Sequence, residues 1–79
     1  MKYVKYDKDE ITRFISMDSE EDAVKVCDVA NSVLGRSPYS VEQFHARYEI
    51  VARGVYPQYY EHRHGFLKGI CVTLGIKSL

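Results

Sequence analysis

Apolar residues recur every three or four positions along most of the chain, which is the spacing of one face of an α-helix. The pattern is clearest over residues 20–34, which follow Ser19, a favourable N-cap, and precede Gly35, a helix stop. Three acidic residues fill the first turn, where the helix dipole favours negative charge. The apolar stripe of this predicted helix consists of Ala23, Val26, Cys27, Ala30, Val33 and Leu34.

Two further stretches, 41–53 and 58–74, show the same helical spacing. Ser40 and Gln43 suit a capping box at the start of the first stretch, and Pro57 suits the first turn of the second. The stripe over 41–53 consists of Val41, Phe44, Tyr48 and Val51. The side chains that we expect in the core of these two segments are Phe44, Leu67, Ile70 and Leu74.

Residues 9–17 leave two alternatives open. Ile11, Phe14 and Ile15 are spaced as on a short helix, whereas the run from Phe14 to Met17 also suits a strand. We take the helix as the prediction. Residues 1–8 alternate only weakly and are expected to form a flexible or strand-like arm.

Together these segments predict an all-α fold, a small bundle of three to four short helices at about 9–17, 20–34, 41–53 and 58–74. The chain has 79 residues, so we expect one helical domain over residues 1–79. A chain of this length buries only about 60 to 65% of its unfolded surface. We therefore expect that a second copy completes the bundle by dimerisation.

Charge is balanced overall but unevenly placed along the chain. Residues 1–35 carry five basic and eight acidic side chains, whereas residues 36–79 carry six and three, together with all three histidines. Overall neutrality argues against strong non-specific DNA binding, which needs many uncompensated basic residues. The chain is 46% hydrophobic and 28% charged, which is typical of a globular domain and not of a disordered segment.

Motifs of catalysis and of metal binding are missing from the sequence. It contains no phosphate-binding loop, nucleophile elbow or His-Glu-x-x-His pattern, so we expect neither an enzyme nor a cofactor. His62 and His64 diverge on a helix, and Glu61 with His64 is a single Glu-x-x-His unit, so we predict no metal site. Cys27 and Cys71 lie among apolar residues, which predicts buried thiols in a reducing compartment. With no apolar signal core or membrane-length run, we expect a cytoplasmic protein without a membrane partner.

One segment resembles a known family of DNA-binding proteins. The run Val-Ala-Asn-Ser-Val-Leu-Gly-Arg-Ser-Pro-Tyr-Ser-Val at 29–41 resembles the helix-turn-helix family, in which an alanine of the first helix precedes a turn glycine. In that family the spacing is usually four, whereas here Gly35 follows Ala30 by five residues and Pro38 lengthens the turn. Over residues 29–47 the resemblance implies a nucleic-acid-binding protein whose second helix enters the major groove. The residues it assigns to nucleic-acid contact are Arg36, Ser40, Gln43 and Arg47.

The stretch 54–75 carries the strongest indication of function. Gly65 and Gly69 lie about one turn apart on one face of the predicted helix, and each costs about 1 kcal/mol relative to alanine. Close approach of another backbone is the usual reason for such glycines. The stretch also contains Tyr56, Tyr59, Tyr60 and Arg63. Tyrosine and arginine are enriched at protein interfaces, and these four side chains could also stack single-stranded bases.

We therefore predict a small non-enzymatic interaction module, which binds either a second copy of itself or another protein. Self-association through the tyrosine-rich C-terminal helix is the preferred hypothesis. The expected interface residues are Tyr56, Tyr59, Tyr60, Arg63, Gly65 and Gly69.

Overall fold

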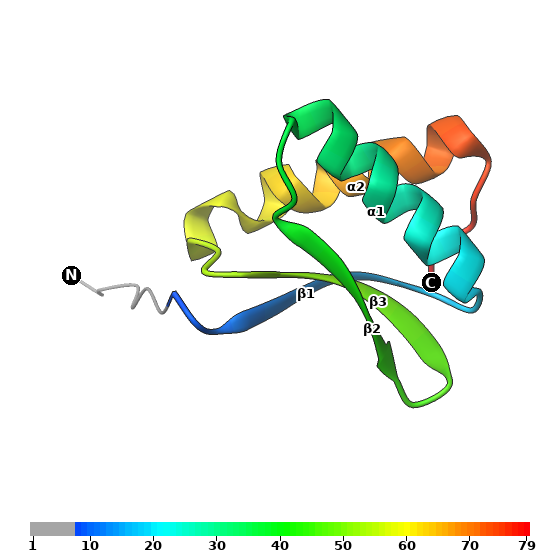
Figure 1. The fold of residues 1–79 in the computed structure, drawn as a ribbon, viewed down its shortest axis with the longest axis horizontal. Coiled ribbons are helices and arrows are strands. Elements are labelled where there is room, and N and C mark those ends of the chain that lie inside the picture. Colours follow the sequence, from blue (N-terminus) through cyan, green and yellow to red (C-terminus); the bar gives the residue numbers. More distant parts are fainter. Residues whose placement is uncertain (1–7) are drawn as a thin grey trace.

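The computed structural model describes residues 8–79, and the N-terminal arm predicted at 1–8 lies almost entirely outside them. Three antiparallel strands form one sheet in the order β1-β3-β2, and two helices lie on one face of that sheet (Figure 1). The elements in chain order are β1 (Ile11–Met17), α1 (Glu20–Leu34), β2 (Tyr39–Phe44), β3 (Arg47–Arg53), a 3-10 turn η1 (Pro57–Tyr59) and α2 (Tyr60–Leu74). The fold is therefore α+β, and the prediction of an all-α bundle was wrong.

The predicted helix over 41–53 is a β-hairpin. Within β3, Tyr48, Ile50 and Ala52 alternate along the strand and pack into the core under the helices, whereas Val51, between them, is buried outside that core cluster. Two residues, His45 and Ala46, connect the strands, and His45 has a left-handed backbone conformation with φ 57°. In two-residue hairpin turns this conformation is usually adopted by glycine or asparagine, and neither residue occurs at these positions.

The predicted helix over 9–17 is strand β1, which pairs along β3. Its register shifts between Arg13 and Ile15, so that Phe14 is an extra residue in a β-bulge. The bulge places Phe14 and Ile15, which are consecutive, both in the core. This breaks the alternation of a strand and leaves apolar residues at the spacing of a helix, which explains the error.

The helix predicted over 20–34 is confirmed as α1. The Ser19 side chain accepts a hydrogen bond from the Asp22 backbone N–H at 3.3 Å, and Gly35 ends the helix with φ 69°. The last helix begins two residues later than predicted, at Tyr60, because Pro57 starts a 3-10 turn instead. It ends at Gly75, which has φ 70°.

The core lies between the sheet and the two helices. Leu67 is fully buried, as predicted, and Ile70 is partly buried against the core. Phe44 and Leu74 were wrongly assigned to the core, because they are 44% and 38% exposed. Phe44 lies at the end of β2 on the sheet face away from the helices, where the Arg13 guanidinium covers its ring at 4.5 Å.

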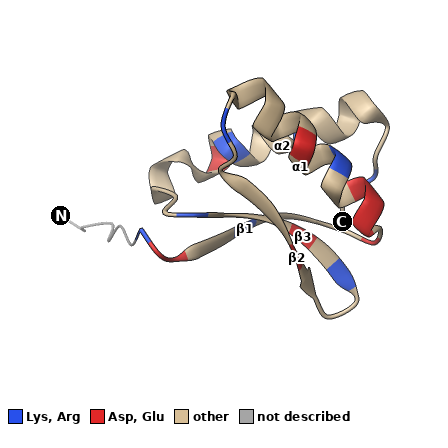
Figure 2. Cartoon of the chain, viewed as in Figure 1, with Lys and Arg blue, Asp and Glu red and all other residues tan. Residues whose placement is uncertain are grey.

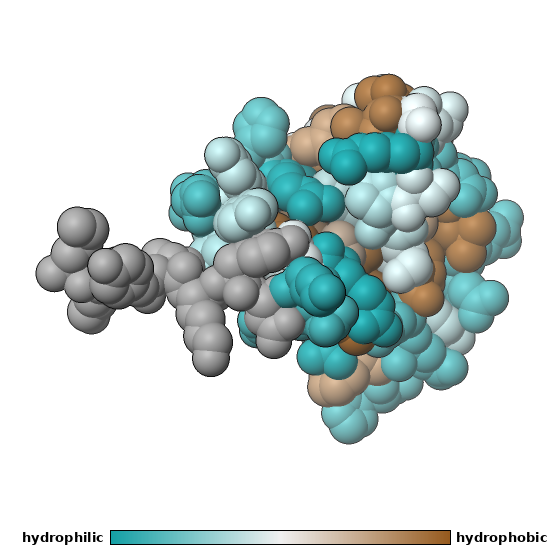
Figure 3. All heavy atoms as spheres, turned by 60° about the vertical axis from the view of Figure 1, so that its left-hand side comes forward, coloured by the Kyte–Doolittle hydropathy of each residue, from teal (hydrophilic) through white to brown (hydrophobic). Residues whose placement is uncertain are grey.

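Both charged and apolar side chains are exposed on the two helices. Figure 2 shows the acidic first turn of α1 beside the C-terminus, where the Leu79 N–H donates to the Ser16 carbonyl at 2.9 Å. Figure 3 shows apolar side chains gathered over the upper, helical side of the molecule. Among the residues described, the most exposed large apolar side chains are Val33 on α1 and Val72 on α2.

Candidate functional site

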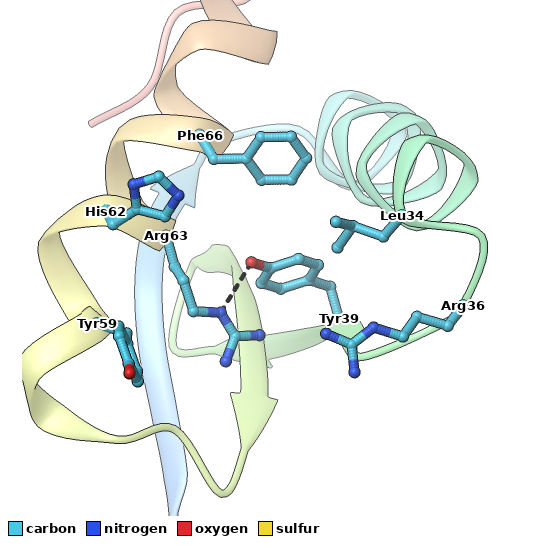
Figure 4. Close-up of a pocket in the computed structure, with 7 residues that line it drawn as sticks. All are labelled: Leu34, Arg36, Tyr39, Tyr59, His62, Arg63 and Phe66. Carbon is cyan, nitrogen blue, oxygen red and sulfur yellow. Dashed lines mark hydrogen bonds between the residues drawn. The ribbon is translucent and has the colours of Figure 1, made fainter.

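A cleft of about 350 Å³ opens where the C-terminal end of α1 meets the start of β2 and the first half of α2 (Figure 4). Arginines and aromatic rings from these separate elements surround it. We call it the arginine cleft, and its lining residues are Leu34, Arg36, Tyr39, Tyr59, His62, Arg63 and Phe66.

Arg63 is held in place from the α2 side of the cleft. Its Nε donates a hydrogen bond to the Tyr39 hydroxyl at 3.1 Å. The guanidinium carbon lies 5.0 Å from the ring centre of Tyr39 and 5.5 Å from that of Phe14, within the range of cation–π attraction. These contacts use only one of the guanidinium nitrogens, so the terminal nitrogens keep their donors for another group.

The rings that Arg63 contacts belong to an aromatic cluster. The Phe14 ring meets the Tyr39 ring edge-on at 5.8 Å and stacks on Tyr60 at 5.3 Å, while Phe66 lies 6.5 Å from Tyr39. The Tyr60 hydroxyl also donates to the Arg13 carbonyl at 3.4 Å. Tyr60 therefore makes its contacts within the subunit, and the Tyr39 and Phe66 rings that line the cleft belong to a packed aromatic cluster.

Asn31 joins α1 to the strand that enters the cleft. Its side-chain amide donates to the Tyr39 carbonyl and accepts from the Tyr39 N–H, each at 3.1 Å. Tyr39 is the first residue of β2, an edge strand, so these two groups point outward from the sheet. Asn31 thus closes the sheet edge beside the cleft and fixes the Tyr39 ring.

The cleft is electrostatically one-sided. Its lining includes Arg36, Arg63 and His62 but no aspartate or glutamate. In the view of Figure 4, the two guanidinium groups point toward the middle of the cleft from opposite walls. Within residues 8–79, no ion pair involves either arginine. The arrangement suits an anionic ligand, because two permanent positive charges lie beside apolar walls without a compensating carboxylate.

The predicted interface residues divide into two groups. Tyr60 and Arg63 turn inward, as described above, whereas Tyr56 and Tyr59 are exposed and meet edge-on at 6.1 Å. Gly65 and Gly69 lie on the exposed side of α2. A Cβ atom built at either glycine has no atom of the described chain within 4 Å. Within residues 8–79, no segment therefore uses the close approach that these glycines permit.

The residues assigned by the helix-turn-helix resemblance do not form a recognition surface. Ser40 and Gln43 lie on β2 and Arg47 lies on β3, so the second helix that this family requires is replaced by the hairpin. Gln43 pairs with Tyr48 on the helix-covered side of the sheet, whereas Arg47 pairs with Phe44 on the other side. Of these four residues, Arg36 alone lines the arginine cleft.

All of the histidines and cysteines, and most of the acidic residues, lie among the described residues. Residues 8–79 contain no group of three His, Cys, Asp or Glu side chains placed to hold a metal ion. Burial raises the pKa of the Cys27 thiol and of the Cys71 thiol, which lowers their nucleophilicity at neutral pH. None of the helices in residues 8–79 combines the length and apolar character needed to cross a lipid bilayer.

Sequence reasoning named Tyr59, Arg63 and Arg36 but assigned them to different surfaces, and it missed Tyr39, Asn31 and Phe66. No local pattern connects the residues of this cleft, because they come from α1, the loop after it, β2, η1 and α2, which only the tertiary structure brings together. Comparisons with protein-family models, with curated proteins and with solved structures matched nothing.

Proposed function

We propose that this chain is a non-enzymatic interaction module that pairs with a second copy of itself through the outer face of α2. This face is made of the residues that α2 turns away from the sheet, namely Glu61, Gly65, Lys68, Gly69 and Val72. At about 100° per residue they fall within an arc of about 100° on the helix. All five are exposed, and Val72 is 74% exposed.

The empty space beside Gly65 and Gly69 is the observation that carries the proposal. Each glycine in a helix interior costs about 1 kcal/mol relative to alanine, and no close contact with another part of the described chain offsets that cost. A helix of another molecule could approach this face closely, because no side chain stands between the two backbones. Val72, one turn further along, would then be covered by the same partner.

Charge on the outer face is self-complementary. Glu61 and Lys68 are seven residues apart, which is about two turns, so they lie on the same side of α2, with the negative charge in its first turn and the positive charge near its middle. An antiparallel pair of α2 helices with its two-fold axis between His64 and Gly65 would bring Glu61 of each copy opposite Lys68 of the other. This favours a second copy of the chain over an unrelated partner.

Three further features support the proposal. A chain of 79 residues has a small core, and covering Val72 and the helix backbone beside the two glycines with a second copy adds stability. Tyr56 and Tyr59 are exposed beside the start of α2 and could extend the contact. Cys27 and Cys71 are free and buried, which supports the reducing, cytoplasmic location proposed from the sequence.

Size-exclusion chromatography with light scattering tests the pairing directly. We expect the wild-type protein to be dimeric at micromolar concentration and the Gly69→Leu variant to be a folded monomer, because leucine blocks the close approach. The matched control is Ser32→Leu, which adds the same side chain at an exposed position of α1. Circular dichroism of both variants verifies that they fold.

A charge exchange tests the antiparallel arrangement. Lys68→Glu should weaken the dimer by placing two like charges together at each end. Adding Glu61→Lys to it should restore the dimer, because the pair then has the same attraction in reversed order. A wild-type protein that stays monomeric at high micromolar concentration refutes self-association. An unrestored double variant refutes this arrangement of the helices.

A further inference from the structure

We propose that the arginine cleft binds a nucleotide, with its phosphate between Arg36 and Arg63 and its base against the exposed ring of Tyr59 (Figure 4). None of the five residues of the outer face of α2 lines the cleft. Only Tyr59, at the mouth of the cleft, is also one of the tyrosines that could extend the dimer contact, so Arg36→Gln tests nucleotide binding separately from self-association. It assigns to the chain a ligand-binding site in addition to the interface.

The charge of the cleft favours phosphate. Within the described residues, no hydrogen bond or ion pair engages the terminal nitrogens of Arg63 or the side chain of Arg36. Arg63 is already oriented by its bond to Tyr39, so little side-chain entropy is lost when an anion binds. A single carboxylate is satisfied by one bidentate arginine, whereas a phosphate dianion offers enough oxygens for two.

The walls of the cleft favour a planar, partly apolar body attached to that phosphate. Tyr59 is 55% exposed at the mouth, and Phe66 and Leu34 provide apolar surface further in. Bases stack on such rings with little dependence on sequence, at about 1 to 3 kcal/mol for each base. A volume of about 350 Å³ lies at the lower end of the range of small-molecule sites.

A phosphorylated peptide fits less well. Peptides commonly bind beside a sheet by adding a strand to its edge, using backbone N–H and C=O groups. At the cleft those groups belong to Tyr39, and Asn31 already occupies both of them. The edge beside the cleft therefore offers no backbone hydrogen bonds to a peptide, whereas a compact nucleotide needs none.

Isothermal titration calorimetry with a defined set of probes tests the proposal. The probes are adenosine 5′-monophosphate, adenosine, inorganic phosphate, phosphotyrosine, and a short oligoadenylate with and without a 5′-phosphate. We expect adenosine 5′-monophosphate to bind more tightly than adenosine or phosphate alone, and added salt to weaken it. Tighter binding of the 5′-phosphorylated oligoadenylate identifies a strand end as the ligand, and weaker binding identifies the free nucleotide.

Three variants locate the ligand. Arg36→Gln removes a cleft charge that makes no contact within the described chain, and Tyr59→Leu keeps an apolar side chain but removes the ring. Arg36→Gln and Tyr59→Leu should each weaken nucleotide binding about tenfold or more. Arg47→Gln is the matched control, because it removes the same charge from β3, outside the cleft.

Four outcomes would overturn the proposal. The first is that no nucleotide probe binds at low millimolar concentration, and the second is that adenosine or phosphate binds as tightly as the nucleotide. The third is that phosphotyrosine alone binds. The fourth is that Arg47→Gln loses as much nucleotide affinity as Arg36→Gln.

Discussion

Asn31→Ala removes the side chain that joins α1 to the first residue of β2. The wild-type amide makes two hydrogen bonds of 3.1 Å to the backbone of Tyr39, which is itself buried. Losing them leaves the Tyr39 N–H and C=O without these partners, and an unsatisfied buried backbone group costs about 1 to 3 kcal/mol. We therefore expect the free energy of unfolding to fall by about 2 to 4 kcal/mol. For a domain of this size that corresponds to a drop in melting temperature on the order of 10 to 30 °C.

Urea unfolding followed by far-ultraviolet circular dichroism measures this change, and hydrogen exchange at the Tyr39 amide reports the local effect. Ser32→Ala is the matched control, because Ser32 is the exposed neighbour on the same helix and should change stability by less than about 0.5 kcal/mol. Asn31→Asp keeps the acceptor for the Tyr39 N–H but loses the donor to its carbonyl, so it should also destabilise the protein. If Asn31→Ala matches Ser32→Ala within about 0.5 kcal/mol, Asn31 does not hold the strand.

Three further predictions concern the core, a helix end and the thiols. Leu67→Ala should lower the free energy of unfolding by about 2 to 5 kcal/mol, because Leu67 is completely buried; a loss below about 0.5 kcal/mol in urea unfolding would place it at the surface. Gly35→Ala should cost about 1 kcal/mol in the same assay, since Gly35 has φ 69° and alanine is strained there despite the open space around it. Alkylation of Cys27 and Cys71 by iodoacetamide should be slow in the native protein at neutral pH, because burial raises the pKa of both thiols and shields them. Mass spectrometry checks this, and native rates equal to those in denaturant would contradict it.

The signals that were read correctly from the sequence are local. Ser19, the acidic first turn and Gly35 act on a helix through groups only a few residues away, so α1 could be predicted with its ends. Gly75 marks the end of α2 in the same way, and Leu67 follows from the spacing inside that helix. These features depend little on what the rest of the chain does.

The strands were missed because their apolar spacing is ambiguous without a partner. Val41, Phe44, Tyr48 and Val51 match a helical stripe, yet Tyr48 and Val51 lie on opposite faces of β3, and Phe44 is largely exposed. Pairing with β1, more than thirty positions earlier in the chain, decides that the segment is extended. Strand propensity depends strongly on such context, which no short window of sequence contains.

The candidate sites divide in the same way. The sequence by itself determined the capped helix α1, most of α2, the two helix glycines, the exposed tyrosines and the balance of charge. Only the tertiary structure decided that Gly65 and Gly69 face open space, that Tyr60 turns inward, and that Arg36, Tyr39 and Arg63 surround one cleft. The physical reason is range, because caps and turns act between neighbours, whereas a cleft and a sheet form only when segments distant in the chain pack together.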